Sequence, residues 1–293
     1  MLTLVVNPIA GNGLAQRTHE RVRALLESRG IEYRSFVTQA PGDAEALCRD
    51  FVREGAEAVA VLGGDGTLNE VLSGMLEAGQ NVPIGYIAAG STNDFAASHG
   101  ISRDILQAAR DIASGVPTPI DVGMFNGRCF AYTASFGVFT RASYAAPQAV
   151  KNAVGHLAYI FEGIRDLANI RPYAVTVEAE GEVRSGEFIF GMVGNSTSMG
   201  GVLRLDPRQI DLHDGKFEVM LVRKPQHIGQ LIAAAVALQS QNYDNELLCF
   251  FKAAHLRISA PGDMDWTLDG EFQSGAENID IQNLHNAVRL ILP

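Results

Sequence analysis

A glycine-rich turn between an apolar run and an amphipathic segment constrains this chain more than any other feature. Residues 58–62 read AVAVL, and such a run is typical of a buried strand in a parallel sheet. The turn Gly63-Gly64-Asp65-Gly66 follows, and its glycines would let a ligand approach the backbone closely. The next apolar residues recur at helical spacing, at Leu68, Val71, Leu72, Met75 and Leu76. This order predicts a phosphate site at the helix N-terminus, with a divalent cation beside the aspartate, although an ordinary strand-to-helix turn is the alternative.

The first 122 residues repeat this order of strand, turn and helix. Strands are predicted over 2–6, 31–37, 58–62, 82–87 and 116–122, with helices between them. Alternating strands and helices predict a parallel sheet covered on both faces, with ligands bound outside the carboxyl ends of the strands. The residues Asn7, Thr38, Gly63 and Ser91 stand at such ends.

The second half of the chain changes character near Gly123. Strand follows strand over 128–138, 173–180, 182–193, 216–222, 255–259 and 264–268. Helical segments are predicted around 147–170 and 226–241. This half therefore predicts a second domain, a mainly antiparallel β-sandwich.

Composition excludes several classes of function. The chain has 293 residues and a net charge of −10, which argues against nucleic-acid binding and against strong attraction to an anionic membrane. Its three cysteines, Cys48, Cys129 and Cys249, follow no disulfide or zinc pattern, as expected for a reducing cytoplasm. The longest apolar run, 231–238, is far shorter than the roughly 20 residues of a membrane span, so we expect peripheral membrane contact at most.

Two acidic motifs in the second half are candidates for metal binding and catalysis. Asp211 and Asp214 flank a turn that could bind Mg²⁺ or Ca²⁺ together with backbone carbonyls, or could be a plain Asp-Gly hairpin turn. Asp269 and Glu271 flank a glycine, and we expect them on one face of an extended strand. A carboxylate there could accept a hydroxyl proton during phosphoryl transfer, although a solvated turn is the alternative.

The motif GGDGTLNEV at 63–71 resembles the nucleotide loop of diacylglycerol kinases, sphingosine kinases and bacterial lipid kinases. NAD kinases and phosphofructokinases carry a related GGDG core, but in NAD kinases the Asn-Glu pair lies well downstream of it. Four weaker motifs follow in the order of the lipid-kinase family: NPIAG at 7–11, GSTNDFA at 90–96, HDGK at 213–216 and DGE at 269–271. The whole chain thus resembles the diacylglycerol kinase catalytic-domain family. Ser91 stands where that family usually has Thr, and His213 where it usually has Asp or Asn.

The resemblance implies a cytoplasmic, ATP- and Mg²⁺-dependent lipid kinase, which transfers the γ-phosphoryl group to a lipid hydroxyl such as that of diacylglycerol. It implies a nucleotide-binding α/β domain at 1–122 with a C-terminal return at 284–293, a β-sandwich acceptor domain at 123–283, and an active site in the cleft between them. Peripheral contact with the inner face of the membrane and formation of a homodimer are both possible for such an enzyme. A glycine-rich lip at 195–201 would border the acceptor site. The implied nucleotide contacts are Asn7, Thr38, Gly63, Gly64, Asp65, Gly66, Thr67, Leu68, Asn69, Ser91 and Thr92. The implied metal ligands are Asp94, Asp214 and the backbone of Asp211 and Lys216, and the implied catalytic acids are Asp65, Asp269 and Glu271.

Two other functions remain open from the sequence. An NAD kinase-like enzyme would phosphorylate a soluble acceptor instead of a lipid. A catalytically silent nucleotide-binding module would need none of the acids Asp65, Asp214, Asp269 and Glu271, and their presence speaks against it. Neither the lipid nor the acid that takes its proton follows from the sequence.

Overall fold

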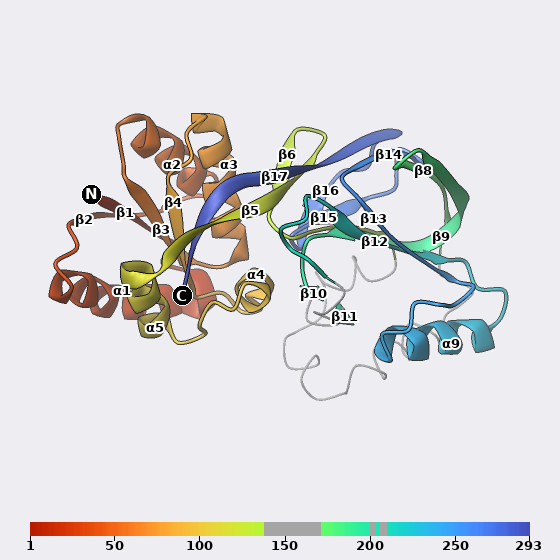
Figure 1. Ribbon diagram of the computed structural model, residues 1–293, viewed down its shortest axis with the longest axis horizontal. Helices are drawn as coiled ribbons and strands as arrows, with labels where there is room; N and C mark the ends of the chain where they lie inside the picture. Colours follow the sequence, from red (N-terminus) through yellow and green to blue (C-terminus); the bar gives the residue numbers. More distant parts are fainter. Residues whose placement is uncertain (138–170, 200–202, 205–209) are drawn as a thin grey trace. The chain divides into compact units, whose positions relative to one another are not determined.

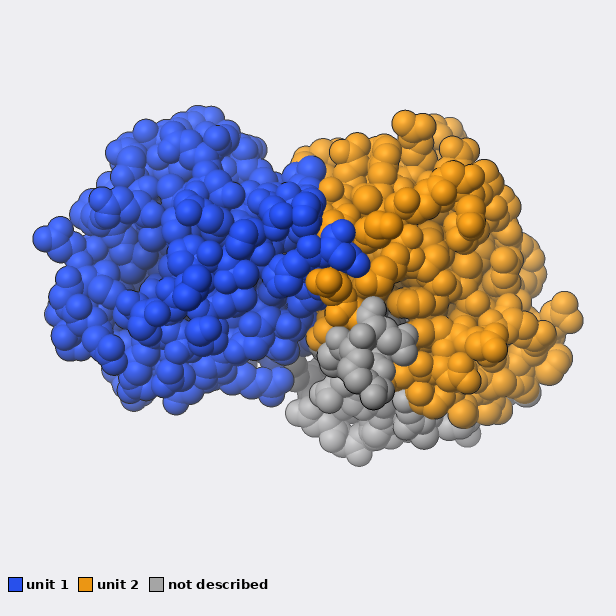
Figure 2. All heavy atoms as spheres, viewed as in Figure 1, with its two compact units in different colours: residues 1–122, 212–214, 284–293 blue, residues 123–211, 215–283 orange. Residues whose placement is uncertain are grey.

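The computed structural model describes residues 1–137, 171–199, 203–204 and 210–293. The chain divides into two compact units, shown in blue and orange in Figure 2. Unit 1 comprises Met1–Val122, Leu212–Asp214 and Leu284–Pro293, and unit 2 comprises Gly123–Asp211 and Gly215–Asn283. The helix expected around 147–170 lies outside the described residues, as do 205–209 and 200–202, which include the last two residues of the expected lip at 195–201.

Unit 1 is built on a parallel sheet with the strand order β2-β1-β3-β4. All residues of β1 and nearly all residues of β3 and β4 are buried, as expected for strands that are covered on both faces. These strands are β1 (Leu2–Val6), β2 (Tyr33–Val37), β3 (Ala58–Gly63) and β4 (Pro83–Ala88).

Helices cover both faces of this sheet, as Figure 1 shows. Helix α1 packs against α5, and α2 packs against α3. Buried residues recur at helical spacing in each, for example Ala15, His19, Val22 and Leu26 in α1. The helices are α1 (Ala10–Ser28), α2 (Asp43–Arg53), α3 (Asp65–Ala78), α4 (Asp94–Ser98) and α5 (Ile105–Ser114). The predicted α/β architecture is confirmed.

The position of the fifth strand differs from the expectation. We expected 116–122 to extend the parallel sheet, but β5 (Val116–Phe125) pairs with β17 and β6 instead. Strand β17 (Asn278–Leu292) lies beside β4, in parallel register with Arg289 opposite Pro83. Strand order depends on partners about 200 residues apart in the chain, and periodicity carries no information about it.

Unit 2 is mainly antiparallel, which confirms the predicted sandwich domain. Its main core gathers large side chains such as Phe136, Phe188, Phe217 and Trp266. A second cluster, with Met192 and Met220, includes residues of α9 (Ile228–Gln239). The strands are β6 (Arg128–Phe130), β7 (Thr133–Gly137), β8 (Tyr173–Ala179), β9 (Glu182–Gly194), β10 (Ser198–Met199), β11 (Leu203–Arg204), β12 (Phe217–Arg223), β13 (Leu248–Ala253), β14 (His255–Ser259), β15 (Trp266–Leu268) and β16 (Glu271–Gln273).

Candidate active site

The turn between β3 and α3 is pressed against the turn that follows β4. A Cβ atom on Gly90 would lie 2.8 Å from the Cα atom of Gly64, and one on Gly64 would lie 3.4 Å from the Cα of Gly90. The N–H group of Ala89 also donates to the carbonyl of Gly63 at 2.7 Å. Glycine is thus required at position 90, because a side chain there would press on the backbone of Gly64.

The loop after β1 joins the same two turns. The side-chain amide of Asn7 donates to Thr67 Oγ1 at 2.9 Å, which ties this loop to the first turn of α3. Gly11 has a φ of +60°, and a Cβ atom there would lie 2.0 Å from the carbonyl oxygen of Ala89. Three loops at the carboxyl ends of β1, β3 and β4 therefore meet backbone to backbone. We call this group of loops, at 7–13, 63–67 and 89–94, the loop cradle.

Asp65 of the loop cradle accepts hydrogen bonds from Tyr86 and Asp94. Its Oδ1 accepts from the hydroxyl of Tyr86 at 3.1 Å, and its Oδ2 accepts from the backbone N–H of Asp94 at 3.2 Å. Burial, together with the Asp65 carboxylate, raises the pKa of Tyr86 well above its usual range. Tyr86 therefore stays protonated and serves as a permanent donor. The carboxyl group of Asp94 is itself buried beside this pair.

The remaining predicted nucleotide contacts of unit 1 have different environments. Thr38 is buried at the end of β2, where its N–H donates to the carbonyl of Val6 at 2.9 Å. Ser91 and Thr92 are exposed, and Asn69 is half-buried. Leu68 is fully buried, and its N–H donates to the carbonyl of Gly64, so its side chain belongs to the core.

Tyr86 and Glu70 were not among the predicted site residues. The carboxylate of Glu70 accepts from the backbone N–H groups of Gly42 and Ala44 at 3.0 and 3.1 Å. These groups open α2, which has no side-chain cap of its own. Glu70, the acid of the GGDGTLNEV motif, thus caps α2, a role that depends on which helix packs against α3.

Asp269 and Glu271 do not share one face of a strand, so that expectation is wrong. Asp269 and Gly270 have φ values of +51° and +86° and form the turn between β15 and β16. An Asp-Gly pair is a strong signal for a two-residue hairpin turn, and this signal was present in the sequence.

The two acids also differ in environment. Asp269 is 8% exposed and accepts backbone N–H donors from Ala131, Tyr132 and Thr133 at 2.5, 3.0 and 3.0 Å. Such donors stabilise the ionised carboxylate. Glu271 is exposed and forms an ion pair with Arg128 at 3.0 Å. The buried acid is therefore rigidly positioned, whereas the exposed acid is held by one surface contact.

The candidate metal loop Asp211–Lys216 is divided between the two units, with Leu212–Asp214 in unit 1. Asp211 and Asp214 are exposed and Lys216 is half-buried. Among the described residues, no group of three or more His, Cys, Asp or Glu side chains comes together.

The chain is similar to known proteins along its whole length. The sequence model of the family "Diacylglycerol kinase catalytic domain" matches residues 1–125, and the sequence model of the family "YegS C-terminal NAD kinase beta sandwich-like domain" matches residues 133–291. The diacylglycerol kinase of Bacillus subtilis (strain 168) is 31% identical over 291 residues, which cover 99% of this chain and 95% of that protein. The chain belongs to the diacylglycerol kinase family. The resemblance seen in the sequence is confirmed.

Other members of the diacylglycerol kinase family agree in sequence and fold. The diacylglycerol kinase of Staphylococcus carnosus (strain TM300) is 31% identical over 292 residues, with 99% of this chain and 94% of that protein covered. A crystal structure of a diacylglycerol kinase from Bacillus anthracis strain Sterne has a TM-score of 0.75 at 21% identity and covers this whole chain and 96% of its own. Another from that strain, provisionally named a diacylglycerol kinase, has a TM-score of 0.82 at 24% identity and covers this whole chain and 95% of its own. These two structures show the shared fold.

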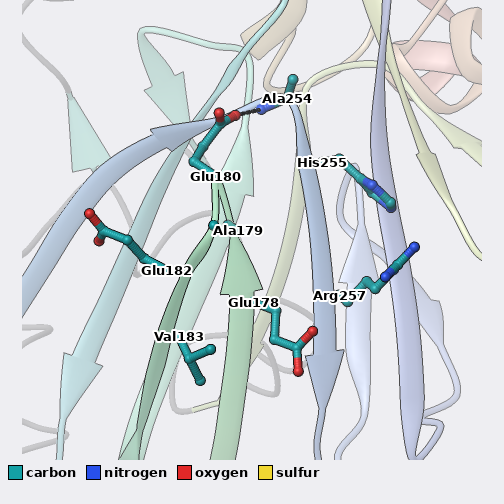
Figure 3. A pocket seen from close by; sticks show the side chains of 9 residues that line it. Glu178, Ala179, Glu180, Glu182, Val183, Ala254, His255 and Arg257 are labelled. Atoms are coloured by element: carbon teal, nitrogen blue, oxygen red, sulfur yellow. Dashed lines mark hydrogen bonds between the residues drawn. The ribbon is translucent and has the colours of Figure 1, made fainter.

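A hollow of about 430 Å³ in unit 2 lies apart from the family motifs (Figure 3). Its walls are β8, β9 and β14, and its nine lining residues include none of the predicted site residues. Glu180 at its rim accepts from the N–H of Ala254 at 3.0 Å.

In the described part of the chain, no helix is both long and apolar enough to cross a membrane.

Proposed function

We propose that this chain is an ATP-dependent lipid kinase, which transfers the γ-phosphoryl group of ATP to a hydroxyl of a lipid such as diacylglycerol. Membership of the diacylglycerol kinase family and the names of the relatives support this activity. The observation that carries the proposal is the loop cradle with Asp65 fixed inside it. A cradle of backbone around a helix N-terminus suits the phosphates of a nucleotide.

The nucleotide would bind to unit 1. Phosphate oxygens would accept from backbone N–H groups at the start of α3, between Gly64 and Thr67. Asn7 and Thr67 are already joined by a hydrogen bond and would hold the loop rather than donate new bonds. The exposed hydroxyls of Ser91 and Thr92 would contact phosphate or ribose. The full proposed set of contacts is Thr38, Gly63, Gly64, Asp65, Gly66, Asn69, Ser91 and Thr92, with Asn7 and Thr67 as the residues that hold the loop, and the buried Leu68 is left out.

The carboxylates of unit 1 suit Mg²⁺, which takes oxygen ligands and usually one or two protein carboxylates together with substrate phosphates. Asp65 and Asp94 would hold it, because the hydrogen bond from Asp94 N to Asp65 Oδ2 keeps the two residues adjacent. When bound, Mg²⁺ would neutralise charge on the β- and γ-phosphates. A second Mg²⁺ would bind to the carboxylate of Asp214 with the backbone of Asp211 and Lys216.

The acceptor would bind to unit 2, with Asp269 as the proton acceptor and Glu271 as its support. Asp269 suits the role because its carboxylate is buried and fixed by three N–H donors. The assignment requires the nucleotide on unit 1 and the acceptor on unit 2 to meet during the reaction. We therefore assign 1–122 with 284–293 to the donor and 123–283 to the acceptor.

We further propose that the enzyme is cytoplasmic and contacts the inner face of the membrane peripherally, where the proposed lipid acceptor would reside. Sedimentation with lipid vesicles measures this contact. If the fraction of the protein in the pellet were the same with and without vesicles, the proposed membrane contact would be wrong.

A radiolabelled-ATP assay tests the proposed activity. The acceptors are diacylglycerol, phosphatidylglycerol, a sphingoid base and undecaprenol in mixed micelles, with NAD in solution. We expect Mg²⁺-dependent label in one lipid. Label in NADP alone, or in no acceptor while ATP still binds, would contradict the lipid-kinase proposal.

A matched pair of variants tests the loop cradle. Asp65→Asn should lower kcat by about 100-fold or more, because it removes charge beside the phosphates. Asp50→Asn removes an exposed carboxylate that pairs with Arg49 on the surface, and should leave kcat unchanged.

A further inference from the structure

Thr133 carries a buried hydroxyl group that the proposed mechanism does not use. The residue begins β7 and is 7% exposed. Its Oγ1 finds no hydrogen-bond partner in the part of the chain that the structure describes. A buried hydroxyl without a partner is destabilising and uncommon in folded proteins, so its presence needs a reason.

The backbone of Thr133 binds the proposed proton acceptor directly. Its N–H donates to Asp269 Oδ1 at 3.0 Å, and its carbonyl accepts from the N–H of Asp269 at 2.8 Å. Thr133 is therefore bonded directly, through its backbone, to the residue that carries this carboxylate. The backbone bonds also fix the residue, so its hydroxyl is presented from a rigid strand.

The hydroxyl lies on a polar strip outside the main core of unit 2. Ala134 and Phe136 of β7 belong to that core, so Thr133 and Ser135 point to the other face. Ser135 already has a partner, because its Oγ lies 2.8 Å from Thr267 Oγ1 on β15. On this strip the Thr133 hydroxyl, unlike that of Ser135, lacks a partner among the described residues.

The strip continues across the sheet away from β15. The residue opposite Thr133 on β9 is Gly194, which carries no side chain. Beyond Gly194, the fully buried Glu218 forms an ion pair with Lys252 at 3.1 Å. The carboxylate and ammonium of this pair neutralise each other. An alcohol suits this place because its oxygen can accept from the Thr133 hydroxyl while its own hydrogen points to the Asp269 carboxylate.

We propose that Thr133 Oγ1 donates a hydrogen bond to the oxygen of the acceptor alcohol and so orients that alcohol toward Asp269. This inference rests on the proposed lipid-kinase function. In the reaction, the alcohol oxygen forms a bond to the γ-phosphorus, the bond from the γ-phosphorus to the bridging oxygen breaks, and ADP leaves. The alcohol proton goes to Asp269, while Thr133 keeps its own proton and only orients the acceptor.

The test compares variants that remove or keep the hydroxyl. Thr133→Val replaces it with a methyl group of similar shape, Thr133→Ala removes it with less volume, and Thr133→Ser keeps it. Loss of one hydrogen bond predicts a KM for the lipid that is roughly three- to tenfold higher in both hydroxyl-free variants, with the KM for ATP unchanged. Thr133→Ser should stay within about twofold of the wild type.

Ser135→Ala is the matched control, because it removes a neighbouring hydroxyl that is bound within the protein. It should lower the melting temperature and leave the lipid KM unchanged. Thr133→Val should not lower the melting temperature, since no protein bond is lost.

Three results would overturn the inference. The first is a wild-type lipid KM in Thr133→Val, which would mean that the hydroxyl binds only water. The second is a KM in Thr133→Ser as high as in Thr133→Val, which would indicate a steric role. The third is a wild-type enzyme that binds ATP but phosphorylates no lipid, and this result alone would also refute the proposed function.

Discussion

Replacing Asp269 by Asn separates its structural role from its proposed catalytic role. Asn accepts a positive φ as readily as Asp, so the turn at +51° is retained. Two of the three N–H donors, from Tyr132 and Thr133, reach Oδ1 and can still be accepted by the amide oxygen. The third, from Ala131, reaches Oδ2 and would face an amide NH₂ group.

The expected loss of stability follows from these contacts. One charge-assisted hydrogen bond is lost and a buried N–H faces another donor, which together cost about 2–4 kcal/mol. For a protein of this size, that cost corresponds to a melting temperature roughly 5–15 °C lower. Activity should also fall, by about 100-fold at a temperature where the variant is folded, because the amide cannot accept the proton.

Glu271→Gln is the comparison for this variant. Glu271 is exposed, and its ion pair with Arg128 lies at the surface, so stability should change by less than about 0.5 kcal/mol. Calorimetry and steady-state kinetics on both variants make the measurement. A folded Asp269→Asn enzyme with full lipid phosphorylation would refute the catalytic assignment, and one with an unchanged melting temperature would refute the hydrogen-bond argument.

Three further perturbations probe unit 1. Tyr86→Phe removes one donor to Asp65 and should cost about 1.5–3 kcal/mol in urea unfolding, with a higher KM for ATP. Gly11→Ala should raise the KM for ATP and lower stability, because its Cβ would lie 2.0 Å from a carbonyl oxygen. Gly79→Ala is the control, since Gly79 has a similar φ but open space around it, and this variant should lose only about 1 kcal/mol of stability. His99 has its pKa lowered from 6.5 to about 4, mainly by burial, so it stays neutral in the folded state while the unfolded chain takes up a proton below pH 6.5. The contribution of His99 to the free energy of unfolding should therefore be fully present above pH 6.5 and be lost toward pH 4, by about 2 kcal/mol at pH 5 in urea titrations. The variant His99→Gln should lack this part of the dependence of stability on pH.

The sequence predicted the elements of the fold better than their arrangement. Apolar periodicity identified the strands and helices of unit 1, because each is decided by residues close together in the chain. The place of β17 beside β4 was not predictable in this way, since the pairing of Arg289 with Pro83 joins distant segments. The strand β13 was missed for another reason. Its sequence LCFFKA is an apolar run without alternation, so periodicity did not mark it as a strand.

Site residues divide along the same line. The glycines of the loop cradle could be predicted, because close backbone approach leaves a compositional signature. Tyr86 could not, since a tyrosine inside an apolar strand reads as core until its hydroxyl is seen to reach Asp65. The arrangement of Asp269 and Glu271 could have been predicted correctly, because Asp-Gly specifies the turn that puts the two acids in different environments.

Motif acids in this chain also hold backbone together, and this changes how their mutations must be interpreted. Glu70 caps α2 through two N–H groups, and Asp269 binds three N–H groups beside β7. Loss of activity on replacing either residue would therefore follow from a displaced element as readily as from a missing catalytic group. Glu70→Gln keeps one acceptor oxygen and should cost about 1 kcal/mol with little change in kcat, whereas a catalytic acid must lose kcat at unchanged folding. Stability and kcat must therefore be measured on the same variants, because together they distinguish an acid that only binds backbone N–H groups from an acid that takes part in catalysis.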